Sequence, residues 1–164
     1  MMEQSISSRL KISIADCKPP ARLKGKDVRC DPLASASIRC VERLLSESSL
    51  MLPETTSVVV ITKTGCVSHI NKVVEAAQQS RPRQGFFSRG GPQMLANYCS
   101  IAFDLHGASY TYFIQQNPDS RTVVENIVNS LVKEKILEQV LLIEADYVGD
   151  ELVVEAMYLD SCLL

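Results

Sequence analysis

The chain has no tryptophan, and aromatic residues make up only 5% of its 164 residues. No apolar stretch approaches the roughly 20 residues that a membrane-spanning helix needs. The polar start, Met1 to Arg9, lacks the apolar centre of a secretory signal. The formal net charge is −2, so no excess of basic charge indicates a nucleic-acid partner. We therefore expect a cytoplasmic protein with no membrane or nucleic-acid partner.

Closely spaced metal ligands are also missing. The six cysteines are scattered without a C-x-x-C pair, and the chain has only two histidines. A structural zinc site usually takes four ligands from closely spaced pairs. Reduced, mostly buried thiols are the ordinary state of such cysteines in a cytosolic protein. We expect no metal site and no cofactor, and no local sequence supports a Cys–His catalytic pair.

What the chain does contain is an ordinary globular composition, with 46% apolar and 22% charged residues. The continuous β-branched run Ser57–Thr62 is typical of a strand buried on both faces of a parallel sheet. Asp31 and Pro32 form the cap and first-turn proline of a helix. Apolar periodicity predicts strands at 10–15, 57–62, 109–114, 140–143 and 152–154, and helices at 32–45, 67–77, 92–105 and 118–132.

This order, β-α-β-α-α-β-α-β-β, predicts an α/β fold of three layers. We expect a mostly parallel, mixed sheet of about five strands with helices on both faces. The short turn at Gly149–Asp150 predicts that the last two strands form an antiparallel hairpin. The wide apolar stripe on Val123–Val132 indicates a helix buried on more than one side. No boundary or repeat is evident, so residues 1–164 are expected to form a single domain.

One stretch carries a resemblance to a known family. Condensing enzymes have a helix of the pattern Asn-x-x-Ala-Gly-x-x-(Ser/Thr)-Ile-x-x-x-Leu-x-Gly-Pro-Ser before the strand that leads to their nucleophilic cysteine. The matching stretch is Gln93–Ser109, where the residues in register are Ala96, Ser100, Ile101, Leu105, Gly107 and Ser109. Upstream, Gly85-Phe86-Phe87 and Val58–Gly65 resemble the family's aromatic loop and preceding strand. The chain thus resembles the N-terminal half of a β-ketoacyl synthase, over about 57–149, and this implies half of a thiolase-like fold.

The resemblance places Gln116 where the family has its nucleophilic cysteine, or Gln115 if the register slips by one residue. An amide can hydrogen-bond there but cannot form an acyl thioester, so the resemblance implies a chain that does not condense alone. Chain-length-factor subunits and decarboxylating loading synthases of the family also carry glutamine for cysteine. The alternative interpretation is that Gln116 is an exposed turn residue past a strand.

The resemblance also implies contacts with partners. In the family, the strand corresponding to 109–114 lies at the sheet edge and pairs with its mate across a dimer, which makes Tyr110, Tyr112 and Phe113 candidate interface residues. A loop covering the edge is the alternative. Arg81, Arg83 and Arg89 are candidate contacts for an acidic acyl carrier protein, or else belong to a solvated loop.

The leading hypothesis is a non-condensing, ketosynthase-like accessory subunit of a bacterial fatty-acid or polyketide pathway, similar to a chain-length factor and in effect a pseudoenzyme. It would form a homodimer, or a heterodimer with a ketosynthase, and a carrier protein is a candidate partner. A second hypothesis is a decarboxylating or condensing enzyme subunit completed by a separate C-terminal half. A third is an unrelated α/β ligand-binding module.

Overall fold

The computed structural model describes residues 6–23, 30–79, 91, 93–114 and 118–162. One mixed sheet has the strand order β1-β5-β4-β2-β3. Its strands are β1 (Ile6–Ser13), β2 (Ser57–Thr62), β3 (Ser109–Phe113), β4 (Gln139–Val148) and β5 (Glu151–Asp160). The β4–β2 and β2–β3 pairs are parallel, whereas β1–β5 and β5–β4 are antiparallel. Four strands therefore run in one direction and β5 runs against them, so the expected mostly parallel, mixed sheet is confirmed.

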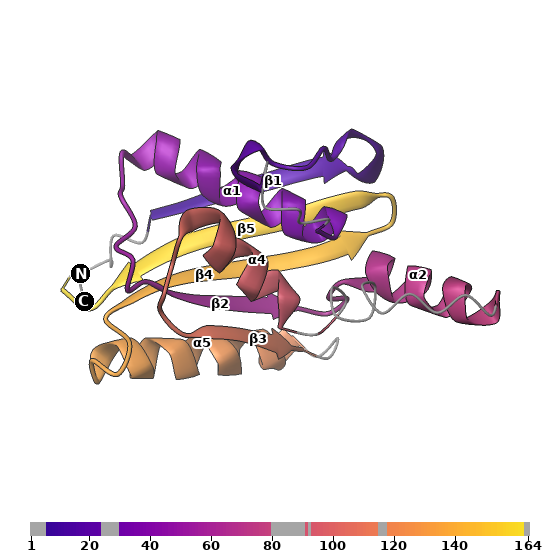
Figure 1. The fold of residues 1–164 in the computed structure, drawn as a ribbon. Helices are drawn as coiled ribbons and strands as arrows, with labels where there is room; N and C mark the ends of the chain where they lie inside the picture. Colours follow the sequence, from indigo (N-terminus) through magenta and orange to yellow (C-terminus); the bar gives the residue numbers. More distant parts are fainter. Residues whose placement is uncertain (1–5, 24–29, 80–90, 92, 115–117, 163–164) are drawn as a thin grey trace.

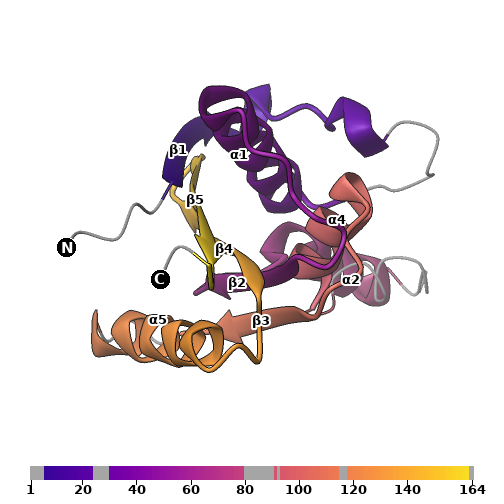
Figure 2. The same cartoon turned by 90° about the vertical axis from the view of Figure 1, so that its left-hand side faces the viewer.

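Helices lie on both faces of this sheet, as Figure 2 shows. They are α1 (Pro32–Ser48), α2 (Val67–Gln78), α4 (Met94–Phe103) and α5 (Pro118–Lys133). On one face α1 packs on β1 and β5, and α4 packs on β2 and β3. The other face carries α5, the one described helix there, while α2 extends beyond the end of the sheet (Figure 1). The predicted element order and three-layer arrangement are confirmed.

The local sequence explains where these elements begin and end. All six residues of β2 are buried because the strand lies between β3 and β4 and is covered on both faces. At the start of α1, the Asp31 carboxylate accepts a hydrogen bond from Leu33 N at 2.9 Å, as an N-cap should. Gly149 has a φ of 61° in the two-residue turn between β4 and β5, and the predicted hairpin is confirmed.

The strand β1 is longer at its start than predicted. The periodicity predicted a strand from Leu10 to Ala15, whereas β1 begins at Ile6, and a single turn of 3₁₀ helix, Ile14–Asp16, follows it. The extra residues are mostly polar, and they pair through their backbones with β5 at the sheet edge. A strand held mainly by backbone bonds at an edge does not need the apolar alternation by which strands are found in a sequence.

The helix α5 is buried on one side rather than on several. Val124, Val128 and Val132 are buried in a cluster that includes residues of β2, β4 and β5. In contrast, Val123 is 55% exposed and Ile127 is 42% exposed. The expected wide burial of the stripe is therefore wrong, because no element among the described residues covers the flank that carries these two side chains.

Residues of the family-like stretch contact one another in the structure. Ser100 of α4 and Ser109 of β3 share a hydrogen bond of 2.8 Å between their hydroxyl oxygens. Gly107 passes so close to the backbone before β2 that a Cβ there would lie 2.4 Å from the Thr56 carbonyl oxygen. Two features of the family-like pattern therefore have a structural reason: the serine pair joins α4 to β3, and Gly107 allows a close approach of two backbone segments. None of the described helices is both long and apolar enough to cross a membrane.

Candidate functional site at the carboxyl end of the sheet

A hollow of about 170 Å³ lies at the carboxyl ends of β2 and β4, beside the first turns of α5. The carboxyl ends of parallel strands are where ligands bind in most open α/β sheets. Its lining is rich in charge and consists of Arg9, Lys63, Arg121, Glu144, Asp146, Val148, Val153 and Glu155. Three basic and three acidic side chains balance one another, so the hollow has no strong preference for an anion or a cation.

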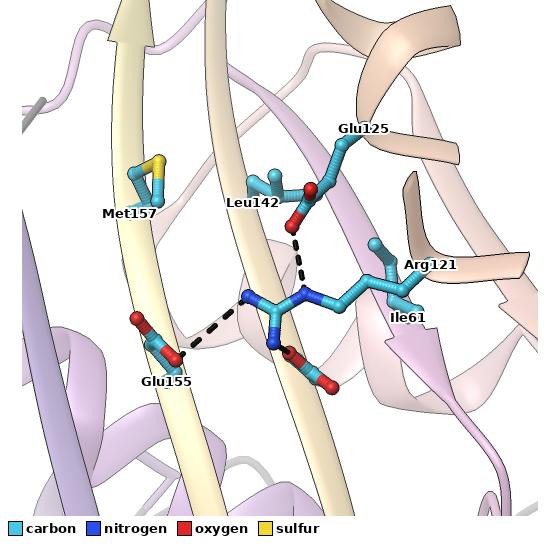
Figure 3. A pocket seen from close by; sticks show the side chains of 7 residues that line it. Ile61, Arg121, Glu125, Leu142, Glu155 and Met157 are labelled. Atoms are coloured by element: carbon cyan, nitrogen blue, oxygen red, sulfur yellow. Dashed lines mark hydrogen bonds and ion pairs between the residues drawn. The ribbon is translucent and has the colours of Figure 1, made fainter. Parts of the chain in front are cut away.

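Arg121 is the centre of an ion-pair network that borders this hollow. Figure 3 shows its guanidinium group reaching from α5 towards β5. Its Nε donates to Glu125 Oε1 at 2.8 Å, its Nη1 lies 2.7 Å from Glu144 Oε2, and its Nη2 lies 4.0 Å from Glu155 Oε2. The network adds ionic contacts between α5 and the strands β4 and β5, on which the helix also packs through apolar side chains. Burial raises the pKa of Glu144, and the charge of Arg121 opposes that rise.

Asp146 holds the turn that follows β2. One carboxylate oxygen accepts hydrogen bonds from Lys63 N at 2.6 Å, from Thr64 N at 3.1 Å and from the Thr62 and Thr64 hydroxyls at 3.1 and 3.2 Å. The next residue of this turn, Gly65, has a φ of 60° and packs against the Phe113 ring. A side chain there would lie 2.7 Å from the ring, so the turn needs glycine.

Asp31 forms a second polar cluster on the opposite face of the sheet. Its carboxylate is fully buried and accepts bonds from His69 N at 3.0 Å, from His69 Nδ1 at 3.3 Å and from the Tyr147 hydroxyl, besides Leu33 N. Burial, with Asp31 beside it, raises the pKa of the Tyr147 phenol. Asp146 and Tyr147 are consecutive on β4, so their side chains point to opposite faces of the sheet. Asp146 bonds directly to 62–64, and Tyr147 is linked to His69 through Asp31.

The expected nucleophile position lies outside the described residues. Gln115 and Gln116 are not described, and neither are Arg81, Arg83 and Arg89, so these predictions stay predictions. In the sequence, Gln116 precedes the start of α5 at Pro118 by two residues. Among the described residues, no group of three or more His, Cys, Asp or Glu side chains is placed to hold a metal ion.

The expected interface residues lie together on β3. This strand is at the edge of the sheet, where Tyr110 is 43% exposed, Phe113 is 50% exposed and Tyr112 is partly buried against the α5 cluster. Sequence reasoning missed the Arg121 network and the Asp31 cluster. The sequence does show that Glu144 and Asp146 alternate at the end of an apolar strand and so share one face, but it gives no signal that Arg121 reaches Glu144.

Comparisons with known proteins give a clear answer for the fold. No protein-family model and no curated protein matches the sequence. Solved structures do match, among them a ketosynthase in complex with its chain length factor from Xenorhabdus doucetiae, with a TM-score of 0.67 and 11% identity over 88% of this chain. The ishigamide ketosynthase/chain length factor matches with a TM-score of 0.66 and 15% identity over 91%.

A third match is 3-oxoacyl-[acyl-carrier-protein] synthase III from Aquifex aeolicus, with a TM-score of 0.51 and 12% identity over 95% of this chain. The chain has a thiolase-like ketosynthase fold. It spans 62%, 48% and 53% of the length of these three matched chains, respectively. The hypothesis of an unrelated α/β module is therefore wrong for the fold, and half of a thiolase-like fold is confirmed.

Proposed function

We propose that this chain is a non-condensing, ketosynthase-like accessory subunit of a polyketide or fatty-acid biosynthetic system. It acts by association with a copy of itself, a condensing enzyme or an acyl carrier protein, rather than by carrying an acyl chain. The observation that carries the proposal is the match of nearly the whole chain to about half of ketosynthase and chain-length-factor structures. Another matched structure is a type II polyketide acyl-carrier protein in complex with its ketosynthase.

The state of the thiols supports the absence of condensation. Glutamine occupies position 116, to which the family resemblance assigns the nucleophile, and an amide forms no thioester. Burial raises the pKa of Cys40 to about 11 and that of Cys66 to about 12, and it raises the pKa of the fully buried Cys99 as well. Since the thiolate is the nucleophilic form, these three thiols are poor substitutes for an activated cysteine.

Exposed apolar surface supports association. Val123 and Ile127 form an uncovered row on α5, and the neighbouring edge strand β3 exposes Tyr110 and Phe113. Apolar patches of this kind on a soluble protein mark sites of contact with another molecule. Burying them would remove apolar area from water at roughly 25 cal/mol per Å².

A second candidate is a subunit of a decarboxylating or condensing enzyme whose C-terminal half is a separate chain. The observation that favours it is the charged hollow at the carboxyl ends of β2 and β4, beside the first turns of α5. In this case a second chain would cover the exposed row of α5 and supply the histidines of the active site. Catalysis would then appear only in the mixture of the two chains.

The test is co-expression of the tagged chain with a ketosynthase and an acyl carrier protein from the same genome, followed by size-exclusion chromatography and assays of condensation and decarboxylation. We expect the chain to elute in an assembly and to have neither activity alone. Tyr110→Lys at the β3 edge should weaken the assembly at least tenfold. Ile136→Lys, at an exposed apolar residue after α5, is the control and should leave it intact. A monomer that joins neither protein would contradict the proposal.

A further inference from the structure

Two half-buried thiols contact the first turn of α1. The Cys17 thiol donates to the Pro32 carbonyl oxygen, with 3.3 Å between sulfur and oxygen, and the Cys30 sulfur lies 2.9 Å from the Ser35 hydroxyl oxygen. Pro32 and Ser35 both belong to the first turn of the helix, and one turn rises only about 5.4 Å. The two sulfur atoms therefore lie near each other, although Cys17 follows a 3₁₀ turn and Cys30 precedes the cap of α1.

The charges of these two thiols also affect each other. Burial is the largest influence and raises the pKa of Cys17, the Arg39 guanidinium lowers it, and negative charge on Cys30 raises it again. Burial likewise raises the pKa of Cys30, and the hydrogen bond to Ser35 opposes that rise. Coulombic interaction weakens with distance, so its presence between the two thiols agrees with their contacts to one turn of α1.

The other described thiols do not combine access with proximity. Three of them are buried and one is exposed after β5, namely Cys40, Cys66, Cys99 and Cys162. Burial raises the pKa of Cys66 and of Cys99, and the charge of Cys30 adds to both rises, but neither thiol is accessible to an oxidant. Oxidation of cysteine requires access as well as thiolate character. Cys17 and Cys30 are both partly exposed, so this pair meets the first requirement.

We propose that Cys17 and Cys30 are an oxidation-sensitive site, at which a peroxide converts the two thiols into a reversible disulfide. The Cys17 thiolate attacks one oxygen of hydrogen peroxide and displaces hydroxide, which takes up the thiol proton as water and leaves a sulfenic acid. The Cys30 thiol then attacks the Cys17 sulfur, the S–S bond forms, and the sulfenic oxygen leaves as a second water. Two thiols are thus oxidised by two electrons and one peroxide is reduced, and a dithiol reductant reverses the change.

The disulfide fastens the chain directly before the Asp31 cap. Asp31 follows Cys30, caps α1 and accepts hydrogen bonds from His69 and Tyr147, so the link secures the point at which α1, α2 and β4 meet. In the unfolded chain the link closes a loop of roughly 14 residues, and the lost freedom of that chain favours the folded state. We expect the oxidised protein to unfold about 6–12 °C above the reduced one.

Peptide mapping of the oxidised chain tests the pair. A Cys162→Ser background removes the exposed thiol. The folded protein is treated with hydrogen peroxide, its remaining thiols are alkylated in denaturant, and the tryptic peptides are compared with and without dithiothreitol. Trypsin cuts after Arg22 and Arg29, so the two cysteines fall in the peptides 12–22 and 30–39, which only the disulfide holds together. We expect this linked pair in about tenfold excess or more over any other cross-link.

Thermal unfolding gives a second measurement, with Cys17→Ser as the matched variant. Oxidation should raise the unfolding midpoint of the Cys162→Ser protein by about 6–12 °C, and dithiothreitol should reverse the rise. The protein that also carries Cys17→Ser should show no rise. Because burial raises the pKa of both thiols, one unit of pH above neutrality should speed formation of the disulfide about tenfold.

Three results would overturn the proposal. Peptides 12–22 and 30–39 that stay unlinked after oxidation would show that the two thiols do not react with each other. A link between 30–39 and the peptide that carries Cys66 would assign the disulfide to a different pair. A linked pair with an unchanged midpoint would show that the disulfide does not secure α1. The peptide map decides even if the Cys17→Ser variant fails to fold, and none of these results bears on the proposed function, because neither thiol lies on β3 or α5.

Discussion

Replacing Gly107 by alanine is expected to destabilise the fold strongly, for a reason visible only in three dimensions. Gly107 precedes β3 and passes over the residues that enter β2. An added Cβ would lie 2.4 Å from the Thr56 carbonyl oxygen and 2.5 Å from that of Thr55. Both obstacles are backbone atoms, so no side-chain rotation can relieve the contact. The backbone at Gly107 and the backbone at Thr55 and Thr56 must either separate or remain in steric overlap.

The hydrogen bonds on either side of Gly107 set the magnitude. His106 N donates to Glu54 O at 2.6 Å and Val58 N donates to Ala108 O at 2.8 Å, so the two segments are bonded before and after the close approach. Overpacking costs about 1–3 kcal/mol, and each backbone bond weakened by separation costs about 1 kcal/mol more. We expect Gly107→Ala to lower the free energy of unfolding by about 3 kcal/mol, which is about 6–12 °C in the midpoint of thermal unfolding for a chain of this size.

Urea unfolding followed by circular dichroism measures this loss. Gly149→Ala is the control, because a Cβ at Gly149 meets nothing within 4 Å and only its φ of 61° opposes the substitution. That conformational penalty is about 1–2 kcal/mol. If Gly107→Ala unfolds at the same urea concentration as Gly149→Ala, or at a higher one, the close approach of the two backbones is not a constraint and the reasoning is refuted.

Three further predictions concern single side chains. Tyr147→Phe removes a donor to the buried Asp31 carboxylate and should lower the free energy of unfolding in urea by about 2 kcal/mol. Tyr158→Phe is the control and should cost less, because its hydroxyl bonds the partly buried carboxylate of Asp160. Equal losses would contradict a larger contribution of the Asp31 cluster to stability. The folded pKa of Glu144 is raised above its ordinary value of 4.5, so its stabilising contribution is full below that pH and is lost as pH rises through the folded pKa. Glu144→Gln should therefore remove part of the stability that is lost as the pH rises above 4.5, and parallel stability–pH curves for the two proteins would contradict this. Iodoacetamide at neutral pH should alkylate the exposed Cys162 before the three buried thiols, as read by peptide mass spectrometry, and earlier labelling of any buried thiol would contradict their burial.

The element order and the hairpin could be predicted from the sequence because they depend on local patterns. The β-branched run of β2 and the glycine of the β4–β5 turn each carry their own signal. The start of β1 could not be predicted, since it pairs at an edge through its backbone. The burial of α5 was overestimated, because an apolar stripe shows which side of a helix is apolar and does not show whether another element covers it.

The candidate site was harder to predict because its residues meet only through the tertiary fold. Arg121 reaches Glu144 and Glu155 from a different element, and no spacing in the sequence indicates that contact. Asp31 was predicted as a helix cap, and this is confirmed. Its further bonds to His69 and Tyr147 depend on α1, α2 and β4 converging at one end of the sheet.

Native mass spectrometry of the chain mixed with a ketosynthase and an acyl-loaded carrier protein tests the central claim most directly, because one spectrum reports both composition and acyl mass. The account predicts that this chain appears in an assembly, with itself or with the ketosynthase, and that after dissociation the acyl mass increment is found on the ketosynthase and not on this chain. An acylated form of this chain, or a monomer that stays alone in the complete mixture, would contradict it.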